Sequence, residues 1–239
     1  MESLIIAMVP APEALRQHLT EVHGPGIEAA LDDALLTDAL VSATGFAVCA
    51  HPSDNNRKIA FAIDTSREDA VSERCRQQGF RVRTIESGDW AGGLTAIIES
   101  EFDRGARSVG LLSGLAPSTP PHLLEQAFRA LLFHPVVAGP DLAGLTYFFG
   151  MQRPLPDFFP RLDWDPMPDI CQVLGVQTRP QTVHLLPFWT QLGTAAGLSW
   201  FASHTSYRAT DNTEVGAASA ALLQRHAAWG SMDAKLSPV

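Results

Sequence analysis

The chain has 239 residues, 46% hydrophobic and 18% charged, so it is long and apolar enough to bury a substantial core. Its formal net charge is −9 at pH 7 without any basic run, which argues against nucleic acid or an anionic membrane as a partner. Its three cysteines contain no CxxC pair, which argues against a zinc knuckle or a disulfide framework.

The amino-terminal segment predicts the first strand of a core. It has no basic leader region, and no apolar stretch in the chain is long enough to cross a bilayer, so we expect a cytoplasmic protein. Leu4 to Val9 is a continuous apolar run, typical of a central parallel strand that is buried on both faces. Pro12 follows and suits the first turn of a helix.

Strand and helix patterns alternate along the rest of the chain. Further strands are predicted at 46–50, 59–63, 80–85, 108–112, 136–138, 145–150 and 182–186. Helices are predicted at 13–22, 27–41, 66–78, 91–105, 121–132, 168–175 and 214–229. The polar stretch from His51 to Arg57 is typical of a loop. This alternation predicts an α/β three-layer domain with a mostly parallel sheet.

Residues 109–128, VGLLSGLAPSTPPHLLEQAF, predict a buried strand, a loop and an amphipathic helix. The run resembles a bacterial family of small GT-A-type glycosyltransferase-like proteins, relatives of sugar-nucleotide transferases, whose loop reads GSDSPDLP. When the prolines are aligned, the two aspartates of the family fall on Leu115 and Ser118.

Five further motifs of that family are matched in the same order. They are PVPGRVKTRL at 10–19, GDLG at 88–92, GPAEDGGYYLIG at 139–150, PWSTPRVLEQT at 163–170, loosely, and LLPPWYDVDTPEDL at 185–198. The resemblance implies a single three-layer α/β/α domain of GT-A type over residues 1–202. Residues 203–239 are then a helical carboxy-terminal extension and tail.

The resemblance also shows where acidic residues are missing. The positions at which the family has a carboxylate and this chain has none are Leu115, Ser118, Ala143, Gln191 and Gly193. A GT-A site uses carboxylates to hold a divalent cation against the nucleotide diphosphate, and hard cations need such oxygen ligands. We therefore expect no metal and no cofactor. Asp141 is the nearest alternative carboxylate, and one is too few for an all-protein site.

Three further positions bear on phosphate binding and on helix capping. Glu13 replaces the glycine of the family's first motif and argues against a phosphate on that loop, while Arg16 keeps a basic residue there. Asp89 is placed to cap the helix that follows it.

Candidate site residues gather around the expected cleft, where ligands bind in open α/β sheets. The candidates for catalysis are Ser118, His122, Asp163 and Asp165. The candidates for substrate binding are Arg16, Ser113, Thr119, Asp141, Tyr147, Trp164 and Trp189. Helix capping is the simpler explanation for each serine and for the threonine taken singly. The run 163–165, two carboxylates around a tryptophan, suits an amine or a polyol, and an acidic surface loop is its structural alternative.

The functional hypothesis is a repurposed GT-A-like biosynthetic protein in specialised metabolism. It performs metal-independent chemistry, transferase-like or lyase-like, on a small polar metabolite, and works with a partner subunit. Two alternatives stay open: a non-catalytic scaffold that stabilises a partner enzyme, and a glycosyltransferase with an atypical metal-free site.

A partner subunit or a homo-oligomer is expected because the carboxy-terminal part is apolar. The residues concerned are Leu198, Trp200, Phe201, Leu222, Leu223 and Trp229. Large exposed apolar patches are rare on monomers, so this segment must pack either on its own sheet or against another subunit.

Overall fold

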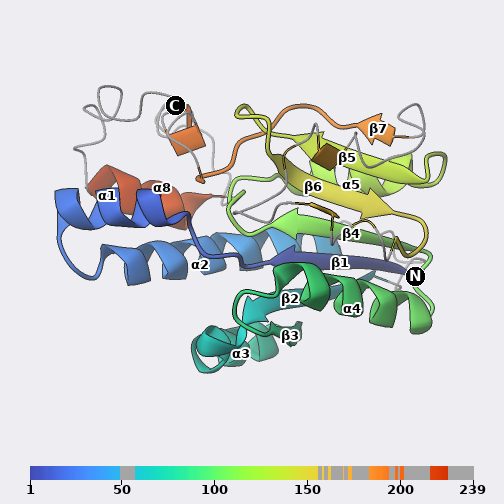
Figure 1. Cartoon of the computed structure of the whole chain (residues 1–239), viewed down its shortest axis with the longest axis horizontal. Coiled ribbons are helices and arrows are strands. Elements are labelled where there is room, and N and C mark those ends of the chain that lie inside the picture. Colours follow the sequence, from blue (N-terminus) through green and yellow to red (C-terminus); the bar gives the residue numbers. More distant parts are fainter. Residues whose placement is uncertain are drawn as a thin grey trace.

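The computed structural model describes residues 1–48, 57–155, 158, 161–162, 169, 172–173, 183–193, 197–198, 200–201 and 216–225. Seven strands form one sheet in the order β3-β2-β1-β4-β6-β5-β7, with β7 at one edge (Figure 1). Their bounds are β1 Glu2–Ala7, β2 Arg57–Asp64, β3 Arg81–Ile85, β4 Ser108–Ser113, β5 Val136–Pro140, β6 Thr146–Met151 and β7 Val183–Leu185. Neighbouring strands are parallel except at β6, which runs antiparallel to β4 and β5.

Helices cover both faces of this sheet. Their bounds are α1 Glu13–His23, α2 Ile27–Val48, α3 Glu68–Gln77 after the short 3₁₀ helix η1 Thr65–Arg67, α4 Trp90–Asp103, α5 Pro121–Ala130 and α8 Ala217–Arg225. A Cβ on Gly110 of β4 would meet Phe128 of α5, so that face carries α5. Val109, the preceding residue of β4, pairs with Ser3 of β1 in the sheet. The Ser3 hydroxyl donates a hydrogen bond to the Glu101 carboxylate of α4 at 2.9 Å. Since successive side chains of a strand alternate between faces, α4 lies on the opposite face.

The fold is therefore the predicted three-layer α/β/α domain with a mostly parallel sheet. The apolar run from Leu4 is buried along its whole length, as a central parallel strand requires. The predicted cap of α4 is also confirmed, because the Oδ1 of Asp89 accepts a hydrogen bond from the Gly92 N–H at 3.0 Å.

Two local predictions were wrong at the junction of α2 and β2. Phe46, expected to start a strand, lies in the last turns of α2, where its ring stacks on Phe128 at 5.1 Å between centroids. Arg57, expected in a loop, is the first residue of β2. A short apolar run fits a helix or a strand equally, and here the packing of Phe46 against α5 favours the helix.

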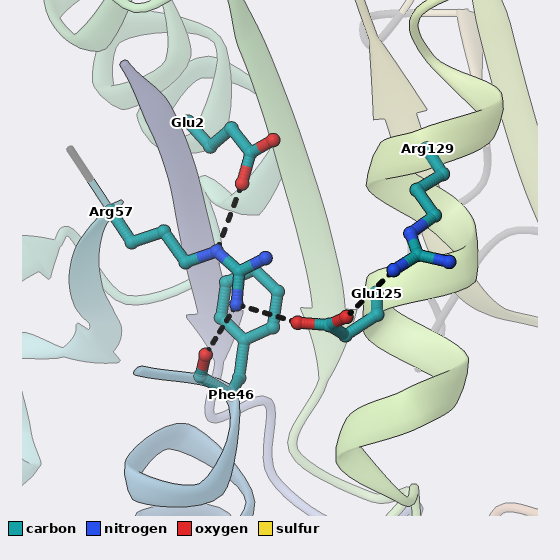
Figure 2. A network of polar contacts seen from close by, with 5 residues as sticks. All are labelled: Glu2, Phe46, Arg57, Glu125 and Arg129. Carbon is teal, nitrogen blue, oxygen red and sulfur yellow. Dashed lines mark hydrogen bonds and ion pairs between the residues drawn. The ribbon is translucent and has the colours of Figure 1, made fainter. Parts of the chain in front are cut away.

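Arg57 joins four elements through one guanidinium group (Figure 2). Its Nε donates to Glu2 at 2.9 Å, and its Nη1 donates to the Phe46 carbonyl at 2.6 Å and to Glu125 at 2.9 Å. The guanidinium carbon also lies 4.1 Å from the centroid of the Phe46 ring. The side chain is only 13% exposed, so these contacts are largely shielded from water.

The carboxy-terminal helix α8 packs against α2 at the buried carboxylate of Asp38. This carboxylate accepts hydrogen bonds from the N–H groups of Ala218 at 2.9 Å and Ser219 at 2.8 Å, which are at the amino terminus of α8. The positive end of the helix dipole offsets the buried charge, although burial still raises the pKa of Asp38 above its ordinary value. Helix α8 thus docks on α2.

Several apolar residues of the carboxy-terminal part are buried within the chain. Leu198, Phe201 and Leu222 belong to its core, whereas Trp200 is half-buried against it. The Leu223 side chain and Trp229 lie outside the described residues. The buried residues therefore need no partner, and the oligomer stays a prediction. No helix of the described segments has both the length and the apolar character of a membrane span.

Replacing Arg57 by alanine should lower the free energy of unfolding by about 2–4 kcal/mol, because the half-buried Glu125 and the Phe46 carbonyl lose their donor. Arg129→Ala is the matched control: it pairs with the same Glu125, at 3.8 Å, but is 80% exposed. Its cost should stay below about 0.5 kcal/mol. Urea unfolding of both variants measures the difference, and equal losses would contradict the structural role given to Arg57.

Candidate functional site

Three loops meet at the carboxyl edge of the sheet, where open α/β folds bind their ligands. They are the loop after β4 (113–120), the β5–β6 turn (141–145) and the segment after β7 (186–193). The Leu192 N–H donates to the Leu115 carbonyl at 2.8 Å, and Asp141 forms a parallel bridge with Trp189. Motif positions that are distant in sequence are thus brought together.

The loop after β4, which carries the aspartates of the resembling family, is buried throughout. The Ser113 Oγ accepts from the Leu115 N–H at 3.2 Å, and the Thr119 hydroxyl donates to the Ala116 carbonyl at 2.9 Å. The Ser118 Oγ accepts from the Trp189 indole N–H at 3.2 Å. Each candidate hydroxyl therefore has a structural partner, and their roles toward a substrate stay predictions.

Residues near the carboxy terminus cover this loop. Gly216, just before α8, lies so close to the loop that a Cβ there would be 3.1 Å from the Ser118 Cβ and 3.4 Å from the Phe201 ring. Its φ of +81° also favours glycine. Leu115, at which the resemblance predicts a lost aspartate, is only 1% exposed and packs in the core.

Asp141 organises the β5–β6 turn. Its Oδ1 accepts hydrogen bonds from the N–H groups of Ala143 and Leu145, both at 2.8 Å, and its own N–H donates to the Leu145 carbonyl at 2.7 Å. The residue is 1% exposed. Burial raises the pKa of the Asp141 carboxyl above its ordinary value, and the bonds from the turn partly offset that rise.

Gln191 completes the surroundings of this carboxylate. Its Nε2 donates to the Asp141 Oδ2 at 3.2 Å, and both side chains are buried. Within the described part of the chain, the Oε1 of Gln191 has no hydrogen-bond partner. From the sequence, Gln191 was predicted only as a position that has lost a carboxylate. Its place at an acidic position of the resembling motif was the one feature that could have marked it as a site residue. The Gln191 amide carries no charge, but its N–H donates a hydrogen bond to the Asp141 carboxylate. A second carboxylate at this position would repel Asp141.

Trp189 and Tyr147 lie close to this pair. Trp189 is half-exposed and meets the Trp200 ring edge-on, with 5.9 Å between centroids. Tyr147 is fully buried, and its hydroxyl donates to the Pro187 carbonyl at 3.1 Å. Burial raises the pKa of the Tyr147 phenol, which therefore stays protonated. Tyr147 holds the segment after β7, whereas Trp189 presents part of its surface to solvent.

The other candidates lie outside the three loops or outside the described residues. Arg16 forms ion pairs with Glu13 and Glu28 on α1 and α2, so the glutamate that replaces the family's glycine neutralises it. His122 is exposed in the first turn of α5. The predicted trio Asp163, Trp164 and Asp165 lies outside the described residues.

Asp169 lies beside the β5–β6 turn. It forms an antiparallel bridge with Leu145, and a Cβ on Gly144 would be 3.7 Å from its Oδ2. Its Oδ1 accepts from the Gln172 N–H at 3.3 Å. This contact places Asp169 at the same edge of the sheet as Asp141.

The described residues do not fit a divalent cation. They contain no group of three or more His, Cys, Asp or Glu side chains that could hold a metal. At the five positions where the resemblance predicts lost carboxylates, Leu115, Ala143 and Gly193 have no side-chain ligand, Ser118 is hydrogen-bonded to Trp189, and Gln191 directs its N–H at the Asp141 carboxylate. Magnesium and manganese favour several anionic oxygens, which this set does not supply.

Sequence and structure comparisons show which proteins the chain is similar to. Residues 47–165 match a family described as an uncharacterized protein conserved in bacteria, DUF2064. No curated protein sequence matches the chain significantly. A structure from Desulfovibrio desulfuricans G20, described as a candidate nucleotide-diphospho-sugar transferase, is 19% identical with a TM-score of 0.74, and the match covers 95% of this chain and 96% of that one.

Two further structures share the fold at lower similarity. The 4-diphosphocytidyl-2C-methyl-D-erythritol synthase of Anaerococcus prevotii is 15% identical with a TM-score of 0.51, covering 86% of this chain and 96% of that one. The Rv0371c protein of Mycobacterium tuberculosis H37Rv, in complex with manganese, is 14% identical with a TM-score of 0.54, covering 83% and 96%. The chain thus has the GT-A-type fold of nucleotide-diphospho-sugar transferase-like proteins.

Replacing Asp141 by asparagine should keep or raise the free energy of unfolding at pH 7.5, by on the order of 1 kcal/mol. The asparagine oxygen still accepts from Ala143 and Leu145, and the Gln191 amide can turn its unpaired Oε1 toward the new N–H. The pKa of the Asp141 carboxyl is higher in the folded protein than its ordinary value of 3.8. The protonated carboxyl therefore stabilises the fold fully at pH values below 3.8, and this stabilisation is lost as the pH rises through the folded pKa.

The advantage of Asp141→Asn should therefore grow from pH 4 to pH 8 in thermal unfolding. Asp103→Asn removes an exposed carboxylate and should show no such trend. A large loss of stability for Asp141→Asn at pH 7.5 would show that the negative charge itself is required.

Proposed function

We propose that this chain is a GT-A-like biosynthetic protein that acts without a divalent cation on a small polar metabolite bound at the carboxyl edge of its sheet. The observation that carries the proposal is the hydrogen bond from Gln191 to Asp141. This hydrogen bond joins the segment after β7 to the β5–β6 turn through an amide and a carboxylate. A metal site would need two or more carboxylates turned toward a common centre.

The fold supports a biosynthetic role, because the related structures include a diphosphocytidyl-methylerythritol synthase and a candidate nucleotide-diphospho-sugar transferase. Loss of the cation removes the charge that would offset a leaving diphosphate. The proposed chemistry is therefore transferase-like or lyase-like without a metal-bound diphosphate. His122, Ser118, Asp163 and Asp165 remain its predicted catalytic residues, and a partner subunit in specialised metabolism remains part of the proposal.

The burial of the loop after β4 favours a second candidate function. Ser113, Ser118 and Thr119 are each at most 2% exposed, so the part of the fold where relatives of this class would do chemistry is closed here. A non-catalytic scaffold subunit that stabilises a partner enzyme needs no open cleft. Co-purification with a partner whose activity survives Asp141→Asn and His122→Ala unchanged would favour the scaffold.

Thermal shift in EDTA tests the leading proposal. Polar metabolites should include at least one that raises the melting temperature without metal, since ligands that bind only the folded state stabilise it. Asp141→Asn should lose that shift and Asp103→Asn should keep it. In a parallel assay, the addition of manganese should not increase the rate at which the protein hydrolyses UDP-glucose or CTP. Manganese-stimulated turnover that EDTA stops would contradict the proposal.

A further inference from the structure

Asp141 differs from the other deeply buried carboxylates in its lack of a positive partner. Glu101 is paired with Arg81 at 2.7 Å and Arg104 at 3.3 Å. Asp38 faces the amino terminus of α8. Within the described segments, Asp141 forms no ion pair and its donors are all neutral amides. Buried charges in proteins are normally paired, so its surroundings are incomplete.

An unpaired acceptor lies next to this charge. Among the described residues, the buried Oε1 of Gln191 has no hydrogen-bond partner, and the Nε2 of the same side chain donates to Asp141. In the same part of the chain, the Asp141 Oδ2 accepts one hydrogen bond, although a carboxylate oxygen can accept two. Two neighbouring oxygens therefore have unused acceptor capacity at one place. Since buried acceptors are usually satisfied, this place fits a ligand that donates several hydrogen bonds.

Trp189 connects this place to the surface. Its bridge with Asp141 sets the two residues side by side, and Gln191 is two positions further along the same segment. The indole is half-exposed and is held at its N–H by Ser118 and at its ring by Trp200. Indole faces attract organic cations, and a ring fixed in this way loses little freedom when it binds one.

We propose that Asp141, Gln191 and Trp189 form a binding site for the protonated amine of a small metabolite. The ammonium group donates to the Asp141 Oδ2 and the Gln191 Oε1, and the adjoining carbon atoms lie against the Trp189 indole. This inference rests on the proposed function, since it names the substrate class of the same site.

Other ligand groups match the site less well. A neutral hydroxyl donates one hydrogen bond and leaves the buried carboxylate without a counter-charge. A phosphate would be repelled by Asp141. A divalent cation favours more anionic oxygens than one carboxylate provides. An ammonium group supplies three donors and a single positive charge, which matches one carboxylate beside one amide oxygen.

Propylammonium and 1-propanol are a suitable pair of probes, because they are nearly isosteric and differ in charge. NMR titration of the ¹⁵N-labelled full chain at pH 7.5 in EDTA, with ionic strength held constant, follows the Trp189 indole N–H and the Gln191 side-chain amide. Propylammonium should shift both signals in a saturable way, with a Kd on the order of 1 mM. Propanol should bind at least about tenfold more weakly.

Variants assign the effect to the site. Asp141→Asn should weaken propylammonium binding at least about tenfold, and Trp189→Phe, which also assigns the indole signal, several-fold. Asp103→Asn, which removes the same charge at an exposed position, should leave binding unchanged. Equal affinity for the two probes, or an unchanged affinity in Asp141→Asn, would overturn the proposal.

The outcome separates this inference from the proposed function. If a neutral polyol stabilises the chain in EDTA through Asp141 and propylammonium does not bind, the proposed function stands and the amine site is wrong. If manganese shifts the Gln191 amide signals and competes with every organic ligand, both are wrong. The wild-type titration alone decides between the probes even if a variant fails to fold.

Discussion

The carboxylate of Asp141 is the constraint on which the carboxyl edge of the sheet depends. One oxygen closes the β5–β6 turn through two backbone N–H groups, and the other accepts from Gln191 in the segment after β7. The Tyr147 hydroxyl fixes that segment at Pro187, and the Leu192 N–H joins it to Leu115. Hydrogen bonds between protein groups therefore join the three loops.

The loop after β4 is closed by packing from several elements. Leu115 and its neighbours in the loop after β4 belong to the core, and Gly216 with the docked helix α8 covers Ser118. Apolar packing thus stabilises this loop. The exposed residues of this edge lie in the β5–β6 turn and in the segment after β7, where Leu142 is 50% and Phe188 65% exposed and Trp189 is half-exposed.

The sequence predicted what depends on local pattern. The apolar runs of β1 and β4, the strand-loop-helix at 109–128 and the cap at Asp89 follow from periodicity and from residue type. The helical state of Phe46 did not follow, because its ring packs on Phe128 from a distant helix. Asp141 and Gln191 are 50 residues apart in the sequence, and Asp38 is 180 residues from Ala218 of α8, from whose N–H it accepts a hydrogen bond. Such partners come from tertiary packing, for which one sequence has no local signal.

Anomalous diffraction from crystals soaked in manganese tests the central claim most directly, that this edge is closed by an amide–carboxylate pair and not by a metal. The account predicts no anomalous peak near Asp141, with the Gln191 Nε2 still within hydrogen-bond distance of the Oδ2. A peak about 2.0–2.5 Å from the Asp141 carboxylate, with the Gln191 amide turned so that its oxygen faces the ion, would contradict it.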